Sequence, residues 1–492
     1  MSTLDKLGAE ICSRKYLGFV PTSNSTKPAH IANGVFRAVS GETCSTHDVH
    51  SWILSESKNN SLSTEEILDQ FSGLLENGVH EEKDKVKQLR FLLNQVFDQD
   101  KTVYPAYEFS AYNISSHWLI NKPLQAEAKI GDFIFDILSK TVNGNRSSAL
   151  DLMRTALNTD TDDYTKILKP ILVNPNNPSS SERCEITYPS DDSIQWDSCK
   201  SLIRTGFDNI SENMKSLGED ENSLVVLERM VNFCGFASFL YLTNANNARY
   251  TGVIPPIVVD SGIGLESVER ASEQSYTTGK KSVEDFFIMA IREILLSESV
   301  PNTRDGCKKW LEEELVFDNV KEREECEPAI RSYFESFSRE EEDPLTSLAH
   351  SLQIALYTFR YKNNSPSDFC RVLGVRSGFV GPRGNRANVK RFIFNSFTFE
   401  TLALSVLSQD DLKSGISFKE FGRKLRKSYN IIIGTDVEEE IDILEKCNIS
   451  QNTPGDLRGD LSLNSQSIAE TFISLGHGKR FADGVTIIKW RA

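Results

Sequence analysis

Apolar residues recur at helical spacing over most of this chain. A Ser-Thr-Glu-Glu start at residues 63–66, typical of a helix N-terminus, precedes five apolar residues on one helical face: Ile67, Leu68, Phe71, Leu74 and Leu75. A second helix is expected over 85–97. In the C-terminal third, the same periodicity predicts helices over 348–361, 397–407, 417–429, 437–447 and 466–475.

Short β-branched runs interrupt this helical pattern. Ile257-Val258-Val259 follows two prolines and predicts a buried strand, as does Ile431-Ile432-Ile433, and a terminal strand is expected over 485–490. The chain is therefore expected to be mainly α with small β elements (α+β) and multi-domain. Helices followed by a short strand, a helix and a terminal strand favour a C-terminal winged-helix-like unit, with a wing turn over 477–480.

The domain boundaries come from shifts in composition. A stretch rich in Pro, Asn and Ser, 174–195, indicates a linker or long loop, and Pro344 interrupts a charged helical stretch. The expected organisation is an N-terminal helical domain, a linker, a central helical domain with one short strand, and a basic winged-helix-like domain, over 1–173, 174–220, 221–345 and 346–492. At 492 residues, about 150 residues per domain also gives roughly three domains.

Cysteine usage and hydropathy indicate the compartment. Nine cysteines are spread singly, an odd count typical of reduced thiols and not of a disulfide framework. The first residues lack a basic segment followed by an apolar run, so no signal peptide is expected. The longest apolar stretch, 231–242, is shorter than the roughly 20 residues that span a bilayer. The prediction is a cytoplasmic protein with no membrane association.

Charge is distributed unevenly along the chain. The net charge is −15, yet residues 360–391 hold eight cations against one anion, a net of +7. Residues 312–343 hold 13 anions against four cations, a net of −9. A local reversal of sign meets a polyanion, an acidic face of the same molecule, or a protein partner with an acidic face. All three interpretations stay open from the sequence.

Nucleic acid is the first of these interpretations. Glycines and Pro382 keep the basic segment open, and arginine offers a planar fork that matches phosphate geometry. The predicted phosphate contacts in this segment are Arg376, Arg383, Arg386, Lys390 and Arg391. The helix over 417–429 buries an apolar stripe and offers a second basic surface, whose predicted contacts are Arg423, Lys424 and Lys427.

Candidates for metal or ligand binding are incomplete. Cys44, His47 and His50 lie within seven residues, but a closed zinc site needs a fourth ligand, and surface histidines at a helix N-terminus are the favoured interpretation. The turn 261–264 resembles a phosphate-binding strand-turn-helix, yet it lacks a lysine or arginine and a third glycine; Asp260 before it is suited to holding a metal or to capping the next helix. No metal, no cofactor and no catalytic residue is predicted.

Three segments carry a resemblance to a known group of proteins. They are VNFCGFASFLYLTNANNARYTGVIPPIVVDSGIGLESVERASEQSY, GVRSGFVGPRGNRANVKRFIFNSFTFETLALSVL and ISFKEFGRKLRKSYNIIIG. The chain here resembles uncharacterised accessory proteins of bacterial antiphage defence islands. The resemblance implies a non-enzymatic component of a larger assembly, with protein partners encoded nearby.

Three functions remain open at this point. The first is a DNA-binding accessory subunit of a defence complex. The second is a protein scaffold or adaptor in the same kind of complex, using its acidic helix and basic loop to join partners. The third is a metal-dependent enzyme built around Asp260 or around the Cys44, His47 and His50 cluster.

Overall fold

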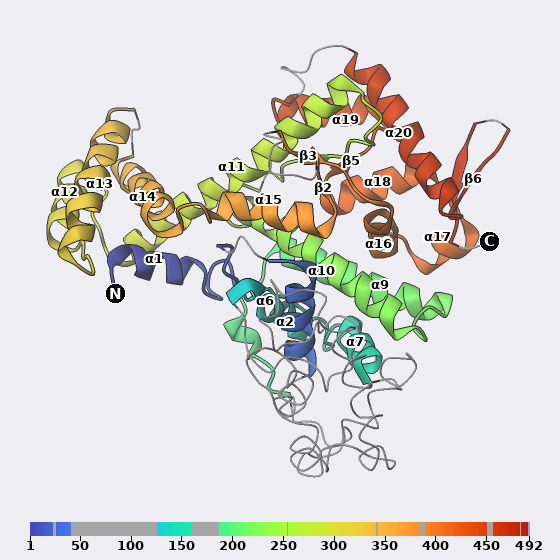
Figure 1. Cartoon of the computed structure of the whole chain (residues 1–492), viewed down its shortest axis with the longest axis horizontal. Helices are drawn as coiled ribbons and strands as arrows, with labels where there is room; N and C mark the ends of the chain where they lie inside the picture. Colours follow the sequence, from blue (N-terminus) through green and yellow to red (C-terminus); the bar gives the residue numbers. More distant parts are fainter. Residues whose placement is uncertain are drawn as a thin grey trace, which may run out of the picture. The chain divides into compact units, whose positions relative to one another are not determined.

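A computed structural model describes most of the chain (Figure 1). The described residues are 1–22, 26–40, 125–158, 186–252, 254–340, 343–382, 389–449, 456–482 and 484–490. Helices dominate and the strands are only two or three residues long, which confirms a mainly α fold with small β elements. The predicted helices over 63–75 and 85–97, and the Cys44, His47 and His50 cluster, lie outside the described residues.

The chain divides into two compact units, and each is discontinuous in sequence. The first unit contains residues 1–24, 192–203 and 236–492, and the second contains 25–191 and 204–235. The predicted boundaries at 173, 220 and 345 therefore do not coincide with the observed division.

The second unit is helical in its described residues. Its elements are α2 (Pro28–Ser40), η5 (Gln125–Glu127), α6 (Ile130–Ser139), α7 (Ser148–Asn158), and parts of α9 (Ser198–Leu217) and α10 (Ser223–Asn246). Helices α2 and α6 approach so closely that a Cβ on Gly131 would lie 2.2 Å from the Gly34 carbonyl carbon. Within the predicted linker, residues 198–217 form α9, which buries an apolar face at Ile203, Phe207, Ile210 and Met214.

Helices α11 (Glu266–Ser297), α14 (Pro344–Ala355) and α15 (Pro366–Ser377) pack together in the first unit. The 32-residue α11 packs along α14 and α15, and α1 (Thr3–Ile11) packs against it. Helices α12 (Arg304–Glu313) and α13 (Val320–Glu340) lie near α14 (Figure 1). Two π-helical turns, η8 (Asn247–Thr251) and η9 (Leu356–Tyr361), extend α10 and α14.

Each π-helical turn supplies an arginine that binds the N-terminal segment. Arg249 of η8 donates to the Lys15 carbonyl oxygen at 2.9 Å and pairs with Glu293 at 2.8 Å. Arg360 of η9 pairs with Asp5 at 2.9 Å and with Glu322 of α13. The last contact joins the basic segment to the acidic stretch, so internal pairing between the two does occur at Arg360.

Two strand pairs meet at the centre of the first unit. Strand β1 (Ile257–Val258) runs parallel to β5 (Ile431–Ile432), which confirms both predicted strands. Strand β2 (Val380–Gly381) is antiparallel to β3 (Arg391–Phe392), and a bridge between Val259 and Phe392 joins the two pairs. Because β5 takes its partner from residues 257–258, the predicted domain 346–492 is not self-contained.

A three-stranded sheet lies in the C-terminal region. Its order is β4 (Ile416–Ser417), β7 (Thr486–Ile488) and β6 (Gly478–Arg480), with both pairings antiparallel. The helices around it are α16 (Ser396–Val406), α17 (Gln409–Ser414), α18 (Phe418–Tyr429), α19 (Val437–Lys446) and α20 (Leu457–Ser474). Helix α20 begins at Leu457 and not at the predicted 466, because Leu457 and Leu461 pack with Val258 and Ile432.

One segment among the described residues is long and apolar enough to cross a membrane by composition. It is Ser223–Thr251, and 78% of its most apolar window is buried inside the protein. A core helix of a folded domain has the same property, so this segment is compatible with the predicted absence of a membrane span.

Candidate nucleic-acid interface

Arg391 of β3 is directed into the first unit. Its Nε lies 2.6 Å from Asp260 Oδ2 and its Nη2 lies 2.7 Å from Glu269 Oε1. The Asp260 side chain is fully buried, and its backbone N–H donates to the Phe392 carbonyl oxygen at 2.8 Å. This placement argues against the predicted phosphate contact by Arg391, because its guanidinium already neutralises a buried carboxylate. It also removes Asp260 as a ready metal ligand.

Lys390, next to it, is buried as well. Only 7% of this residue is exposed, and its Nζ donates to the Pro382 carbonyl oxygen at 2.7 Å. Desolvation, assisted by the nearby Arg371 charge, lowers the pKa of Lys390. The predicted phosphate contact by Lys390 is therefore disfavoured too.

The other predicted contacts in this segment lie elsewhere. Arg376 is exposed in the last turn of α15, where it takes part in other interactions of the fold. Arg383 and Arg386 lie outside the described residues. Among the described residues of this segment, the structure brings Lys390 and Arg391 together, with Lys390 buried and Arg391 partly exposed.

Helix α18 divides its cations between solvent and the protein. The apolar stripe of Phe418, Phe421 and Leu425 is buried as predicted. Arg423 is largely exposed and donates to Glu420 at 3.0 Å, and Lys427 is exposed.

Lys424 of the same helix is half-buried and pairs with Asp411 at 2.7 Å. Burial raises the pKa of Asp411, but hydrogen bonds from Lys424 and Ser408 outweigh it and hold that pKa below its usual value.

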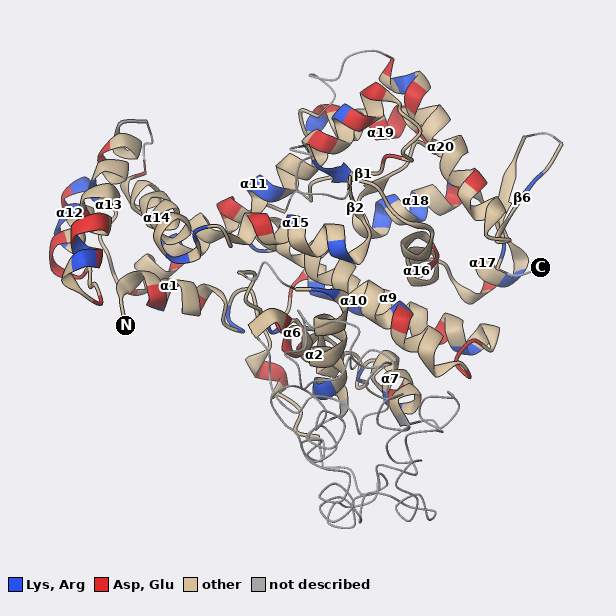
Figure 2. Ribbon diagram, in the orientation of Figure 1, with Lys and Arg blue, Asp and Glu red and all other residues tan. Residues whose placement is uncertain are grey.

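The β6–β7 hairpin of this sheet carries exposed cations, and Lys and Arg are blue in Figure 2. Lys479 lies opposite Ile487 of β7, and its Nζ is 5.4 Å from the centre of the Phe481 ring. Lys479 and Lys489 are exposed, and Phe481 at the tip is 46% exposed. We call these three residues, Lys479, Phe481 and Lys489, the wing face. None of them was predicted as a site residue.

The hairpin turn differs from its predicted position. Residues 478–480 are strand β6, and the turn lies between Phe481 and Val485, whose N–H and carbonyl are 2.9 Å apart. The reason is that His477 is buried. Its Nε2 lies 2.8 Å from Glu400 Oε1, and its ring stacks on Trp490 with centroids 3.9 Å apart.

Helix α20 precedes the hairpin directly. Its exposed face includes Ser462, Gln466 and Ser474, which offer hydrogen-bonding groups. On its buried face, the Asn464 amide donates to the Val259 carbonyl at 2.9 Å and accepts from the Ser261 N–H at 2.8 Å. The end of β1 therefore holds α20 in place.

The described residues contain no group of three His, Cys, Asp or Glu side chains arranged to hold a metal ion. Searches for related proteins give no family model, no curated protein and no solved structure that matches this chain.

Proposed function

We propose that this protein is a non-enzymatic accessory subunit that binds duplex DNA through its C-terminal winged-helix-like unit. The observation that carries the proposal is the sheet order β4-β7-β6, with α20 placed immediately before the exposed hairpin. In helix-turn-helix proteins, one helix enters the major groove and flanking elements contact the backbone. Here α20 takes the groove and the wing face takes the adjacent backbone.

The chemistry of the two elements fits these roles. Lys479 and Lys489 offer ammonium groups for phosphate, and Phe481 offers an aromatic surface at the tip of the hairpin. Ser462 and Gln466 of α20 can hydrogen-bond base edges. The antiphage part of the proposal rests on the sequence resemblance. In that setting, the subunit acts within a complex that binds DNA.

The overall charge of −15 limits the affinity expected. Binding that depends on a few local cations releases few counterions, so its salt dependence should be shallow but measurable. Each phosphate contact contributes about 0.9 to the slope of log affinity against log salt. Loss of two lysine contacts should reduce that slope by about 1.8.

The test uses the full chain and a fluorescein-labelled duplex, with anisotropy measured between about 50 and 200 mM salt. We expect binding at the lower salt, and a double variant, Lys479→Ala with Lys489→Ala, that binds more weakly and with the reduced slope. The matched control is Lys321→Ala, an exposed lysine on α13, which should bind as the unaltered protein does.

Two outcomes would remove the proposal. One is an unaltered protein that fails to bind duplex at the lower salt while its circular dichroism shows a folded helical protein. The other is a double variant that binds with the same affinity and the same slope as the unaltered protein.

A further inference from the structure

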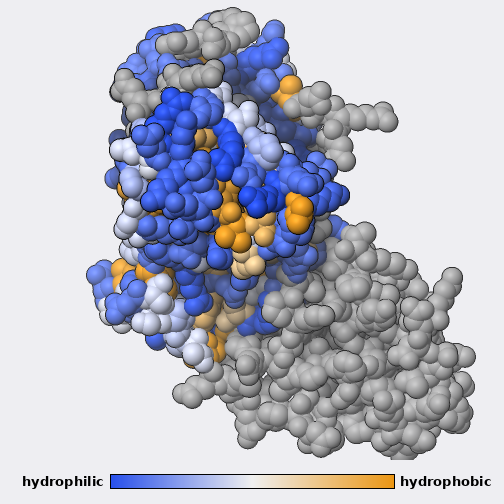
Figure 3. All heavy atoms as spheres, turned by 90° about the vertical axis from the view of Figure 1, so that its left-hand side faces the viewer, coloured by the Kyte–Doolittle hydropathy of each residue, from blue (hydrophilic) through white to orange (hydrophobic). Residues whose placement is uncertain are grey.

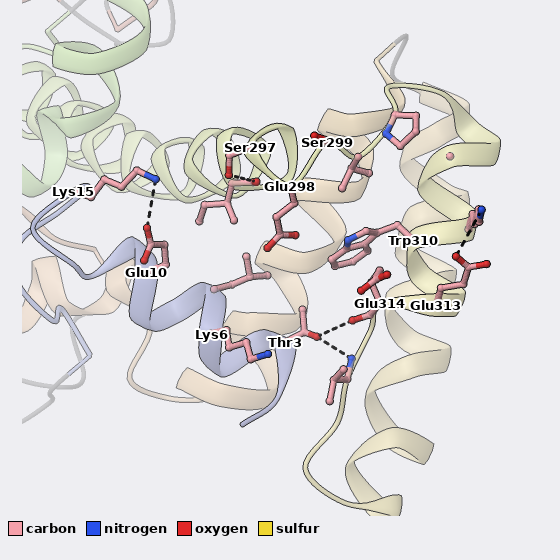
Figure 4. Close-up of a pocket in the computed structure, with 17 residues that line it drawn as sticks. Thr3, Lys6, Glu10, Lys15, Ser297, Glu298, Ser299, Trp310, Glu313 and Glu314 are labelled. Carbon is pink, nitrogen blue, oxygen red and sulfur yellow. Dashed lines mark hydrogen bonds and ion pairs between the residues drawn. The ribbon is translucent and has the colours of Figure 1, made fainter.

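A groove lies between α1, the C-terminal end of α11 and α12, all within the first unit (Figure 4). Its volume is about 880 Å³. The Trp310 ring in its wall is buried and the exposed charges that line it are of both signs, so the described residues make no built site for a ligand there. Figure 3 faces this end of the molecule and shows small apolar patches within a hydrophilic surface. The more informative contacts lie at the base of the β6–β7 hairpin.

His477 connects α20 to this hairpin. Its backbone N–H donates to the Phe472 carbonyl oxygen, in the last turns of α20, at 2.9 Å. Its own carbonyl oxygen accepts from the Lys489 N–H at 2.9 Å. The residue therefore closes the end of the helix and begins the pairing of the two strands, and only 4% of it is exposed.

The His477 side chain joins three further parts of the C-terminal region. Its Nε2 lies 2.8 Å from Glu400 Oε1 on α16, and its ring stacks on Trp490 at an interplanar angle of 12°. Trp490 follows β7, is 2% exposed, and donates its N–H to the Leu412 carbonyl oxygen of α17 at 3.0 Å. We call Glu400, His477 and Trp490 the hairpin anchor.

The hydrogen bond to Glu400 orients the His477 ring. Because an ionised carboxylate only accepts hydrogen bonds, Nε2 carries the donated proton. The other ring nitrogen, Nδ1, is buried and has no hydrogen-bond partner among the described residues. One hydrogen bond and one stack therefore determine the orientation of the ring, and loss of the carboxylate would leave a buried N–H unsatisfied.

The lysines of the wing face lie next to this anchor on both strands. Lys479 comes two residues after His477, and Lys489 comes directly before Trp490. Strand β6 pairs only with β7 among the described residues, and β7 pairs with β4 over two residues. A hairpin of such short strands is marginally stable by itself in water, so its direction relative to α20 depends on the anchor.

We propose that Glu400 and His477 are positioning residues for DNA binding. They fix the direction of the hairpin relative to α20, so that the wing lysines and α20 meet the same duplex. This role rests on the proposed function, because it requires that the wing lysines contact DNA. The His477 side chain is buried and the Glu400 side chain is 16% exposed, so both act through the lysines and not on the duplex itself. A hairpin that is already ordered loses less conformational entropy when DNA binds.

A double-mutant cycle between Glu400 and the wing lysines tests this role. Duplex anisotropy is measured with the full chain for Glu400→Ala, for Lys479→Ala with Lys489→Ala, and for the triple variant. We expect Glu400→Ala to weaken binding nearly as much as the lysine double variant does, and to lower the salt slope by a comparable amount, about 1.8. The triple variant should bind no more weakly than the lysine double variant, because the lysines that Glu400 positions are already absent.

Two further variants separate positioning from stability. Glu400→Gln keeps an oxygen that accepts from the Nε2–H, so it should restore the unaltered affinity and slope. Glu445→Ala removes an exposed acid of α19, and therefore the same charge, and it should bind as the unaltered protein does. Circular dichroism checks the fold of each variant. If Glu400→Ala is unfolded, His477→Phe replaces it in the cycle, since it removes the hydrogen bond and keeps a ring against Trp490.

The possible failures are distinguishable. An unaltered protein that binds no duplex removes the proposed function and the positioning role with it. If the lysine double variant binds more weakly but a folded Glu400→Ala binds as the unaltered protein does, the positioning role alone is overturned. It is also overturned if the triple variant binds much more weakly than the lysine double variant, or if Glu400→Gln binds as weakly as Glu400→Ala.

Discussion

The tripeptide Lys-Arg-Phe occurs twice in the C-terminal part of this protein and is used in opposite ways. At 390–392 it runs into β3, and there Lys390 and Phe392 are buried and Arg391 pairs with the buried Asp260. At 479–481 it runs out of the end of β6, and there the same three residue types are exposed.

The difference follows from the position of each strand in its sheet. Strand β3 pairs with β2 and also bridges to Val259, the residue after β1, whereas β6 is the edge of the sheet β4-β7-β6. An interior strand brings its side chains against neighbours that can bury and neutralise them, and an edge strand leaves cations in water. A basic run therefore indicates a binding surface only once its place in the sheet is known.

The largest expected difference in stability is between alanine variants of the two phenylalanines, Phe392 and Phe481. Phe392 is 2% exposed and makes edge-on ring contacts with Phe239 and Tyr276, each with centroids 5.7 Å apart. Phe392→Ala should lower the free energy of unfolding by about 3–5 kcal/mol. Phe481→Ala should change it by under about 0.5 kcal/mol. Urea unfolding of both variants measures the contrast, and similar losses for the two would contradict the assignment of interior and edge.

Variants of the two arginines, Arg391 and Arg480, should differ somewhat less in their free energy of unfolding. Arg391→Met leaves the buried Asp260 carboxylate without its main partner, which should cost about 3 kcal/mol of unfolding free energy. Arg480→Met breaks a pair with Glu470 in which both side chains are exposed, and should cost under about 1 kcal/mol. An Arg391→Met variant as stable as Arg480→Met would show that the Asp260 contact contributes little.

Asp411 of α17 gives a further test of how much a cation near the protein surface contributes to stability, because it pairs with Lys424 of α18. A carboxyl group with a lowered folded-state pKa stabilises the fold above its unfolded pKa, about 3.9 for aspartate, and that stabilisation disappears as pH falls through the lower folded value. We expect Asp411→Asn to cost about 0.5–1 kcal/mol at neutral pH. In unfolding measured against pH, the gap between the two proteins should hold down to about pH 5 and close at lower pH. A difference in unfolding free energy that grows as the pH falls would contradict a lowered pKa for Asp411.

Arg423 should show the smallest effect on stability. It is largely exposed and pairs with Glu420 three residues before it, so Arg423→Ala should leave the free energy of unfolding nearly unchanged. The effect of Arg423→Ala on duplex binding distinguishes the α18 surface from the wing face as the DNA contact. A loss as large as that of the wing lysines would restore α18 as a DNA contact, and an unchanged affinity would leave the wing face as the main one.

Local pattern was sufficient to predict helix α18 and strands β1 and β5. The helix follows from its periodicity and the two strands from their β-branched runs, because each contains its own apolar pattern. Strand β4 has no such pattern. Strand β4 exists because Ile416 pairs with Ile488, which is distant in sequence, and nothing near Ile416 indicates this.

The candidate site was less accessible from the sequence. Arg391 turns toward Asp260, which lies 131 residues away in the sequence. The composition around Arg391 does not indicate that contact. The wing face was missed because a single Lys-Arg pair is a weak signal beside the +7 stretch.

The contacts of Arg249 and Arg360 with residues 1–22 also determine the order in which the first unit can assemble during synthesis. Lys15 precedes Arg249 by 234 residues, so a ribosome adding about 5–20 residues per second makes its partner roughly 10–50 s later. Throughout that delay Leu4, Leu7 and Ile11 have no completed surface to cover them. Because a helix of nine residues is marginal in water by itself, we expect α1 to become stable only after these partners have been made.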